Sequence, residues 1–223
     1  MMVRMGEGFD QIRQEGNSLI CGCAASLAMA AKAAAHAGLT GLEFASGIPG
    51  SIGGAVFMNA GAYGGEMKEV LQEARILDRE GASVSTVSAE ALDMGYRHTR
   101  LHESGEIVLE AKIELVPGDP EEIRKTMADL TARRNEKQPV TYPSAGSFFK
   151  RPEGYFAGKL IQDAGLKGLS IGGAQVSQLH SGFIINTGGA TATDILQLMQ
   201  VVQARVLEEF GVELKPEVRI IGE

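Results

Sequence analysis

Glycine is concentrated in one stretch of this chain, and that stretch restricts the possible folds more than any other feature. Residues 47–65 read GIPGSIGGAVFMNAGAYGG, in a chain that has 29 glycines among 223 residues. No repeat or low-complexity tract accounts for these glycines, so we interpret them as turns and points of close backbone approach. The stretch is therefore not expected to be a simple helix. It predicts a backbone held close to another part of the protein or to a ligand.

Two well-known glycine motifs do not fit this stretch. A Walker-type phosphate loop needs Lys and then Ser or Thr after its last glycine, whereas Gly53 is followed by Gly54, Ala55 and Val56. The dinucleotide fingerprint G-x-G-x-x-G is also absent from the loop. What remains is an array of unencumbered backbone N–H groups able to approach an anion or a flat ring. Spacing alone favours such a ligand-binding loop and a tight crossover inside the core equally.

Charge and aromatic content exclude some classes of partner. The chain has 21 Lys and Arg against 28 Asp and Glu, 5% aromatic residues and no Trp, which argues against nucleic-acid binding. It has no apolar run of roughly 18 residues and no secretory signal in Met1 to Ile12, so we expect a cytoplasmic protein without membrane partners. Cys21 and Cys23 lack a Cys and His cluster, so we expect buried thiols and no metal site. The oligomeric state stays open.

Hydrophobic spacing and capping residues predict an α+β fold. Helices are expected from Ala28 to Ala37, from Asp119 as cap to about Lys137, from Ala157 to Ala164, and from Thr193 or Asp194 to Phe210. Strands are expected at 70–78, 84–87, 107–115 and 218–221, with a loop-rich segment after Pro143. No regular βαβ alternation is present, so a doubly wound parallel sheet is not expected.

Four ordered blocks of sequence identify a family. Residues 41–55 (GLEFASGIPGSIGGA), together with Asn59 to Gly64 (NAGAYG), resemble the UDP-N-acetylenolpyruvoylglucosamine reductases, also named UDP-N-acetylmuramate dehydrogenases. Three further blocks are similar to motifs of the same family. They are GYRHT at 95–99, SAGSFFK at 144–150 and PEVRIIG at 216–222. The blocks occur in order and are spread over most of the chain, which makes the match specific.

The resemblance implies a domain organisation. It suggests the second half of a vanillyl-alcohol-oxidase/PCMH-like FAD-binding domain at residues 1–116 and an α+β substrate-binding carboxy-terminal domain at residues 117–223. Family members begin with a lobe that carries a second glycine-rich loop for the FAD pyrophosphate, and this chain begins after it. We therefore expect these residues alone to hold FAD weakly. The chain departs from many members at Arg151, where they have Asn, and at Thr99, where they have Ser.

The resemblance also implies an activity. NADPH would reduce bound FAD, and the flavin would reduce the enolpyruvyl ether of UDP-N-acetylenolpyruvoylglucosamine to UDP-N-acetylmuramate, a precursor of bacterial peptidoglycan. Two alternatives stay open: another FAD oxidoreductase of the same superfamily, and a non-catalytic module that binds a UDP-sugar without flavin. The joint presence of Arg97, Ser147 and Glu217 argues against the first alternative.

Catalytic roles follow from the chemistry and from the resemblance. Reduction of an enolpyruvyl double bond needs a hydride at one carbon, a proton at its neighbour, and stabilisation of an enolate in between. The resemblance implies that Ser147 donates the proton, that Arg97 stabilises the substrate carboxylate and the enolate, and that Glu217 acts in its protonated form. From the residues alone, the alternatives are a turn serine, a surface salt bridge and a solvated glutamate.

Binding roles are assigned in the same way. Tyr63, Lys150 and His180 are weaker candidates for holding the substrate, and a partly buried structural role for His180 is at least as well supported. The predicted contacts with the cofactor come from the glycine-rich stretch: Gly47, Ile48, Pro49, Gly50, Ser51, Gly53, Gly54, Asn59, Ala60 and Gly61.

Overall fold

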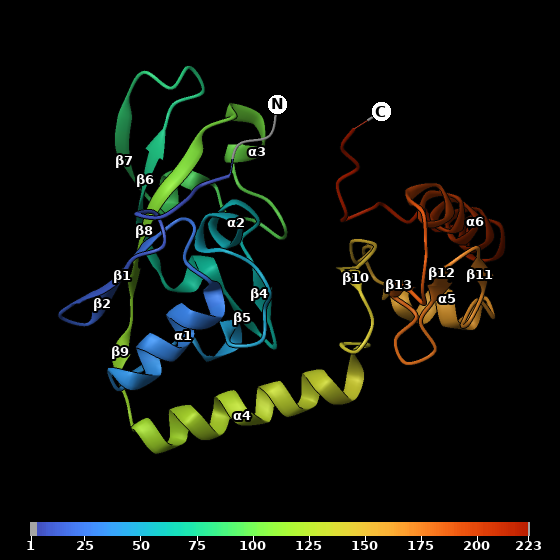
Figure 1. Cartoon of the computed structure of the whole chain (residues 1–223), viewed down its shortest axis with the longest axis horizontal. Helices are drawn as coiled ribbons and strands as arrows, with labels where there is room; N and C mark the ends of the chain where they lie inside the picture. The colour runs from blue at the N-terminus through green and yellow to red at the C-terminus, as the bar shows by residue number, and fades with distance from the viewer. Residues whose placement is uncertain (1–3, 223) are drawn as a thin grey trace. The chain divides into compact units, whose positions relative to one another are not determined.

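A computed structural model of the chain describes residues 4–222, which divide into two compact units (Figure 1). Unit 1 ends at Arg133 and unit 2 begins at Arg134, inside helix α4 (Pro120–Lys137). The domain boundary at 116/117 stays a prediction. Its outer limits, residues 1 and 223, lie outside the described residues.

Unit 1 is built on an antiparallel sheet. The sheet has five strands in the order β1-β2-β8-β6-β7, formed by β1 (Ile12–Glu15), β2 (Ser18–Gly22), β6 (Leu71–Leu77), β7 (Val84–Ser88) and β8 (Ile107–Glu114). The strands expected at 70–78, 84–87 and 107–115 are confirmed. The β1–β2 hairpin gave no sequence signal, because β2 is buried on both faces and β1 has only Ile12 partly buried. Neither strand therefore shows the alternation typical of a half-buried strand.

Two irregularities change which side chains of β6 are buried. The pairing with β8 shifts register between Leu71 and Glu73 and again between Arg75 and Ile76. As a result Leu71, Ala74 and Ile76 are all buried. From the sequence, strict alternation predicts Leu71 on one face of the strand and Ala74 and Ile76 on the other, and for these residues that prediction is partly wrong. Bulges of this kind cannot be read from period-two spacing.

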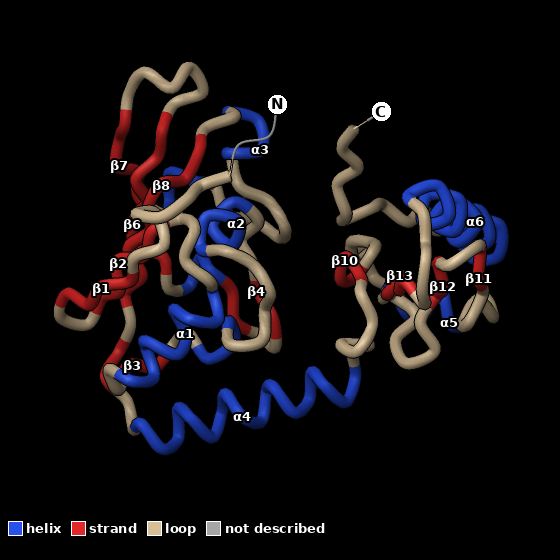
Figure 2. The backbone as a smooth tube through the Cα atoms, in the orientation of Figure 1, coloured by secondary structure: helices blue, strands red, loops and turns tan. Residues whose placement is uncertain are grey.

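Two helices cover one face of the sheet (Figure 2). Helix α1 (Leu27–His36) packs on β2, and helix α2 (Ile52–Phe57) packs on β2 and β8. The helix expected at 28–37 is confirmed, with Ser26 at its N-cap and Gly38 at φ +66° after its end. Helix α2 was not expected. It is a six-residue helix inside the stretch that the glycine content predicted to be irregular.

Short elements complete unit 1. The hairpin β4 (Gly61–Ala62) to β5 (Gly65–Glu66) follows α2 and leads into the 3₁₀ turn η2 (Met67–Glu69). Strands β3 (Leu39–Thr40) and β9 (Val116–Pro117) form a second small pair. The remaining turns of helix are η1 (Glu43–Ala45), η3 (Glu90–Leu92) and α3 (Leu101–Ser104).

Unit 2 has its own sheet and core. The sheet has four strands in the order β10-β13-β12-β11, formed by β10 (Ser144–Ser147), β13 (Phe183–Asn186), β12 (Ala174–Val176) and β11 (Ser170–Ile171). Helix α6 (Ala192–Phe210) packs on β11 and β12 through a buried stripe that includes Leu198, Val202 and Val206. Helix α5 (Ala157–Asp163) contacts α6.

The helices of this region were predicted better than its strands. Helix α5 is confirmed, and α6 begins slightly earlier than expected, with Thr191 as its cap. The loop-rich segment expected after Pro143 is instead this sheet of two- to four-residue strands. The strand expected at 218–221 is wrong: Pro216 forms an isolated bridge with Phe149, and Ile220 and Ile221 are 60% and 76% exposed. Their apolar character therefore does not reflect burial in a sheet.

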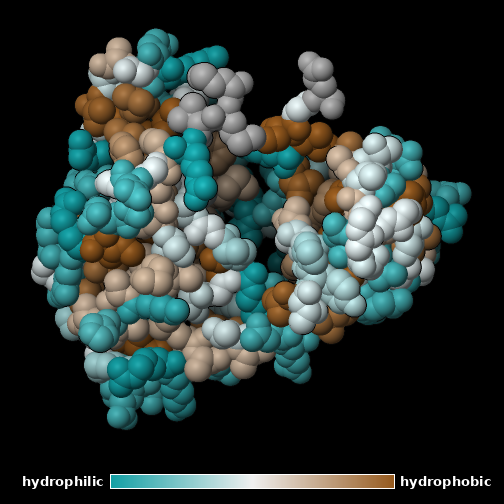
Figure 3. All heavy atoms as spheres, in the orientation of Figure 1, coloured by the Kyte–Doolittle hydropathy of each residue, from teal (hydrophilic) through white to brown (hydrophobic). Residues whose placement is uncertain are grey.

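Helix α4 buries far less apolar side chain than α6, the other long helix. Its acidic first turn and basic last turn follow the predicted capping, and Asp119 Oδ1 accepts the Glu121 N–H at 2.8 Å. Ile123 is its buried residue, and hydrophilic side chains cover its first turns in Figure 3. Within residues 4–222, no helix combines the length and apolar character needed to cross a bilayer.

Candidate functional site

The backbone N–H groups at the start of α2 are used inside the protein. Ile52 N–H donates to Ala25 O and Gly53 N–H donates to Cys23 O, both at 2.9 Å. The side chain of Ser51 accepts from Gly54 N–H at 3.3 Å. The sequence predicted backbone N–H groups that are free to approach a ligand. For Ile52, Gly53 and Gly54 this prediction is wrong. Their N–H groups attach α2 to the end of β2 and to its own cap.

Two of the predicted cofactor-binding glycines are required by close packing of the chain. A Cβ at Gly53 would lie 2.9 Å from Cys23 Cβ and 3.2 Å from Cys23 O. A Cβ at Gly61 would lie 2.7 Å from the carbonyl oxygen of Gly65. These neighbours are backbone atoms or atoms fixed to backbone, so they cannot move aside. These positions match the tight crossover that was one of the two interpretations of the loop.

Other glycines of the loop leave open space. Among the described residues, a Cβ at Gly50 would meet no heavy atom within 4 Å, and one at Gly54 would meet only Ser51 Oγ, at 3.5 Å. Both residues are exposed. A ligand can therefore approach the backbone closely at Gly50 and Gly54, as the second interpretation requires. Each interpretation of the loop fits a different set of glycines.

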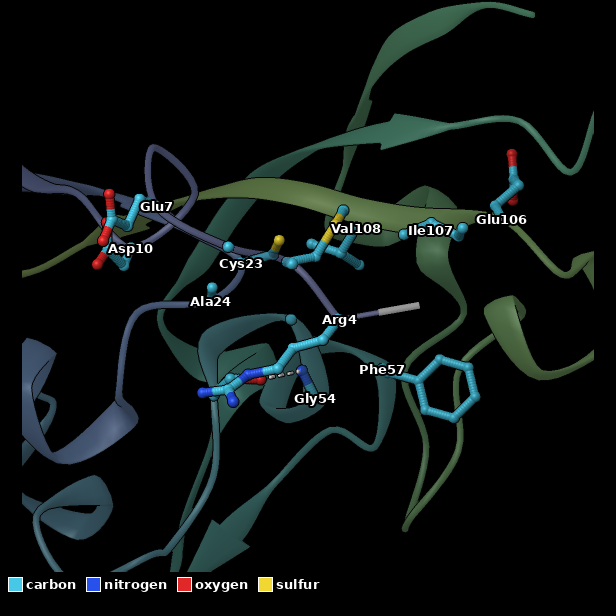
Figure 4. Close-up of a pocket in the computed structure, with 14 residues that line it drawn as sticks. Arg4, Glu7, Asp10, Cys23, Ala24, Gly54, Phe57, Glu106, Ile107 and Val108 are labelled. Atoms are coloured by element: carbon cyan, nitrogen blue, oxygen red, sulfur yellow. Dashed lines mark hydrogen bonds between the residues drawn. The ribbon is translucent and has the colours of Figure 1, made fainter. Parts of the chain in front are cut away.

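A pocket of about 780 Å³ opens beside the start of α2. Its lining includes Arg4, Cys23, Ser51, Gly54, Phe57 and Glu106. Figure 4 shows the side chain of Arg4 extending along the pocket towards Gly54. The volume lies within the range of small-molecule sites, roughly 300–1,000 Å³.

The pocket residues fit part of a flavin dinucleotide. The guanidinium of Arg4 offers a charged donor for a phosphate, while Phe57 and Val108 supply apolar surface. Ser51, Gly53 and Gly54 are predicted cofactor residues that line this pocket. Arg4, Phe57 and Glu106 were missed, because they stand outside the glycine motif and nothing in their local sequence marks them.

The other predicted cofactor residues lie on either side of α2. Gly47, Pro49 and Gly50 belong to the loop between η1 and α2, where Ile48 packs against the core. Ala60 follows α2, packs against the same core, and donates its N–H to Ala55 O at 2.8 Å. Asn59 is fully buried. Any contact of these residues with FAD stays a prediction.

Left-handed backbone marks several of the predicted site residues. The non-glycine residues with positive φ are Asn59 (43°), Tyr63 (54°), Arg97 (53°) and Asp93 (47°) within the described part of the chain. This conformation is uncommon for residues other than glycine and costs energy, so it persists only where surrounding contacts enforce it. Three of these four residues were predicted from sequence to belong to the site.

Arg97 lies over the β4–β5 hairpin. Its Nη2 donates to the carbonyl oxygen of Gly61 at 3.3 Å, and its Cζ lies 5.2 Å from the ring centroid of Tyr96. Tyr63, at the tip of the same hairpin, is 47% exposed. The structure therefore places Arg97 and the hairpin bearing Tyr63 together.

The turn that carries Arg97 is anchored to the end of α2. Thr99 is completely buried, and its Oγ1 donates to the carbonyl oxygen of Phe57 at 2.8 Å. His102 Nε2 lies 3.1 Å from the same oxygen, and its ring stacks on that of Phe57 with centroids 4.2 Å apart. A carbonyl only accepts, so His102 Nε2 carries a hydrogen. Serine could make the Thr99 bond as well, which explains why this departure from the family pattern is tolerated.

Ser147, Lys150 and Glu217 lie together in unit 2. Ser147 is exposed at the end of β10, followed by the buried Phe148. The N–H of Glu217 donates to Phe148 O and the N–H of Lys150 donates to Lys215 O, both at 2.9 Å. The carboxy-terminal segment thus runs beside the strand end that carries the predicted proton donor.

His180 lies beside Ser147, on the other side of Gly182. Its Nδ1 accepts the Gly182 N–H at 3.1 Å, and burial is the main factor that lowers its pKa. A Cβ at Gly182 would lie 3.0 Å from His180 Cε1 and 3.5 Å from Ser147 Oγ. The partly buried structural role considered for His180 is therefore present in the structure, and it places the ring close to the predicted acid.

Comparison with known proteins gives a consistent result. Residues 138–221 match the family described as UDP-N-acetylenolpyruvoylglucosamine reductase, C-terminal domain, and residues 1–86 match the FAD binding domain family. Proteins named UDP-N-acetylenolpyruvoylglucosamine reductase from Agathobacter rectalis, Pediococcus pentosaceus and Alkaliphilus oremlandii are 58%, 55% and 51% identical to this chain. These alignments cover 92%, 96% and 100% of the chain and 65%, 71% and 73% of the respective relatives.

A solved structure resembles the chain as well. The crystal structure of UDP-N-acetylenolpyruvylglucosamine reductase (MurB) from Thermus caldophilus is 38% identical to it, with a TM-score of 0.84. The match covers 96% of this chain and 76% of that one.

Proposed function

Because the chain belongs to the UDP-N-acetylenolpyruvoylglucosamine reductase family, we propose that it reduces the enolpyruvyl ether of UDP-N-acetylenolpyruvoylglucosamine to UDP-N-acetylmuramate in peptidoglycan synthesis. FAD is the proposed cofactor and NADPH the proposed reductant. The observation that carries the proposal is the position of Ser147. It is exposed at the end of β10, beside the segment that holds Glu217 and beside the ring of His180.

The chemistry divides between the cofactor and the chain. FAD, when bound, supplies the hydride that one carbon of the double bond receives. The chain's residues must hold the substrate, stabilise the enolate and deliver a proton to the neighbouring carbon. Arg4, Ser51, Gly54 and Phe57 are the residues of the pocket proposed to hold FAD.

Each of the catalytic residues then has one task. The planar guanidinium of Arg97 binds the substrate carboxylate and the developing negative charge. The hydroxyl of Ser147 gives its proton to the α-carbon and recovers a proton from solvent after turnover. Glu217, in its protonated form, donates a hydrogen bond to the enolate. Lys150, Tyr63 and His180 are proposed to hold the substrate.

A proton-transfer experiment tests the role of Ser147. In Ser147→Ala, NADPH should reduce the flavin at the normal rate, while reoxidation by the enolpyruvyl substrate should slow by about 10²–10⁴-fold. Ser144→Ala is the matched control. It removes a second exposed hydroxyl of β10, whose Oγ lies 3.4 Å from Gly146 N. Normal reoxidation in Ser147→Ala would assign the proton to Glu217 or to water.

A binding experiment separates the reductase from a non-catalytic UDP-sugar module. Titration of the chain with FAD, followed by flavin fluorescence, measures cofactor binding directly. A parallel titration with UDP-N-acetylenolpyruvoylglucosamine measures substrate binding. Binding of the nucleotide sugar without any binding of FAD would favour the non-catalytic module.

A further inference from the structure

Asn59 is a polar side chain enclosed in the core of unit 1. It has no exposed surface and adopts φ +43° between the end of α2 and the start of β4. Burial of a polar group is costly unless its hydrogen bonds are satisfied, and left-handed backbone adds a further cost. A residue that carries both costs must be held by specific contacts.

The side-chain amide of Asn59 makes three hydrogen bonds. Nδ2 donates to Glu66 Oε2 at 2.6 Å and to the carbonyl oxygen of Gly95 at 2.9 Å. Oδ1 accepts the backbone N–H of Lys68 at 2.9 Å. A carboxylate and a carbonyl only accept and an N–H only donates, so these partners fix the orientation of the amide. Both amide hydrogens are used within the protein.

These bonds join Asn59 to two later segments of the chain, residues 66–68 and the turn that begins at Gly95. Glu66 ends the β4–β5 hairpin, Lys68 lies in η2, and Gly95 begins the turn that carries Arg97. The ion pair between Lys68 Nζ and Glu66 Oε1, 3.1 Å long, balances the charge of the carboxylate. The hydrogen bond from Arg97 to Gly61 connects the same turn to the same hairpin a second time.

We propose that Asn59 is a positioning residue that fixes Arg97 and Tyr63 relative to each other, through Gly95 and through the hairpin. The roles of Arg97 and Tyr63 rest on the proposed function, whereas the positioning rests on the contacts of Asn59. The sequence had predicted that Asn59 binds the cofactor. Its amide hydrogens are already bound by Glu66 and Gly95, so its side chain acts on the site through those residues.

Hydrogen exchange in the full chain tests this positioning without any need for activity. Asn59→Asp keeps the shape and tolerates left-handed backbone, but it replaces both donors with an acceptor facing Glu66 and Gly95. We expect amide exchange in residues 61–68 and 95–99 to accelerate at least about tenfold, with unit 2 unchanged. Unchanged exchange in these two segments would overturn the proposal.

Asn186→Asp is the matched control. Asn186 Oδ1 accepts from the N–H groups of Gly188 and Ala190, and aspartate keeps both bonds. The change adds the same charge to the chain as Asn59→Asp. Exchange in 61–68 and 95–99 should therefore match the unmodified protein, and acceleration there would mean that added charge alone explains the effect, against the proposal.

A second substitution at Glu66 provides a rescue. In Asn59→Asp with Glu66→Gln, the new amide at position 66 can donate to the carboxylate at position 59, so exchange should return partway to normal. Recovery should be incomplete, because the bond to Gly95 stays lost. Glu66→Gln alone should have a small effect, since the oxygen of the new amide still accepts from Asn59. Failure of the pair to recover would contradict the direct contact.

If Asn59→Asp fails to fold, a substitution at Glu66 tests the same proposal. The side chain of Glu66 is 32% exposed, so Glu66→Ala should fold and should remove one of the three bonds. Exchange in residues 61–68 should then rise about threefold, with a smaller rise in 95–99. The absence of any rise would count against the proposal.

Ligand titrations distinguish positioning from direct contact with the cofactor. In Asn59→Asp, the Kd for FAD should stay within about twofold, while the Kd for UDP-N-acetylenolpyruvoylglucosamine should rise about tenfold. A tenfold weaker FAD complex with unchanged hydrogen exchange would make Asn59 a cofactor ligand and overturn the proposal. If neither the unmodified chain nor any variant reduces the substrate at saturating FAD, the proposed function fails, and the exchange result still decides the positioning.

Discussion

The backbone N–H of Glu217 donates a 2.9 Å hydrogen bond to the carbonyl oxygen of Phe148. This bond holds Glu217 beside the strand end that carries Ser147, and it involves no atom of the glutamate side chain. Substitutions of the Glu217 side chain therefore leave the donor and the acceptor of this bond in place. The side-chain role can be tested separately from folding.

Glu217→Gln should retain part of the reductase activity that Glu217→Ala loses. A carboxyl that acts only as a neutral hydrogen-bond donor is partly replaced by an amide, whereas alanine offers no donor. Urea unfolding of both variants would show whether either substitution also changes the stability of the chain. Equal activity of the two variants would show that hydrogen bonding by residue 217 plays no part in the reaction.

Arg97→Lys should lower kcat/KM for the enolpyruvyl substrate by at least about tenfold. Lysine keeps the positive charge but loses the planar fork, together with the arrangement that places Nη2 3.3 Å from Gly61 O. Steady-state kinetics over a range of substrate concentrations would measure the change. Near-normal turnover would place Arg97 outside the site.

The stability of unit 2 should fall as the pH drops below about 6.5. Burial lowers the pKa of His180 from the usual value of 6.5, with a smaller contribution from Lys167. The unfolded chain then binds a proton more readily than the folded one, so stability is lost as pH falls from 6.5 towards the folded-state pKa. The protonated ring would also lose its acceptor for the Gly182 N–H.

His180→Gln removes this titration and serves as the comparison. Urea unfolding of both proteins at several pH values between 7.5 and 5 would measure the difference. The unmodified chain should lose more unfolding free energy than His180→Gln over this interval. Parallel pH curves for the two proteins would show that His180 does not contribute.

Cys21 should resist thiol reagents in the folded protein. It is completely buried, and burial raises its pKa to about 12, so the reactive thiolate is scarce at pH 8. Cys23 is 4% exposed and lines the pocket, and it should react first. Mass spectrometry after timed alkylation would give the order, with both thiols reacting quickly in urea. Bound FAD should slow the alkylation of Cys23 specifically.

The sequence predicted the longer elements of this fold because their signals are local. Helix α6 has an apolar stripe, a threonine cap and a closing glycine, all within residues 191–211. The start of α4 also has a local signal, because Asp119 caps the helix and Pro120 is its first residue. The sheet of unit 2 was missed because its strands have two to four residues, too few for a period to be visible.

The candidate site was predictable only where a motif carried it. Arg97, Ser147 and Glu217 came from family blocks. The structure places Ser147 at the end of β10, Glu217 in the segment beside it and Arg97 in a turn over the β4–β5 hairpin, and their catalytic roles stay predictions. Arg4 and Phe57 line the pocket through tertiary packing, so nothing in their sequence neighbourhood reveals them. The glycine-rich motif identified Asn59 as a site residue, but its burial and its three hydrogen-bond partners could be known only from the fold.

The close approach of α2 to the end of β2 affects how tolerance to mutation should be interpreted in this loop. A saturation library scored for growth would show Gly53 and Gly61 as intolerant as any ligand-binding residue, because their missing Cβ atoms make room for Cys23 and Gly65. Gly54 lies in the helix, and within residues 4–222 only Ser51 Oγ lies within 4 Å of an added Cβ, so intolerance there would instead report a molecule outside the chain. In this loop, the location of an intolerant glycine carries more information about the ligand than the degree of its intolerance.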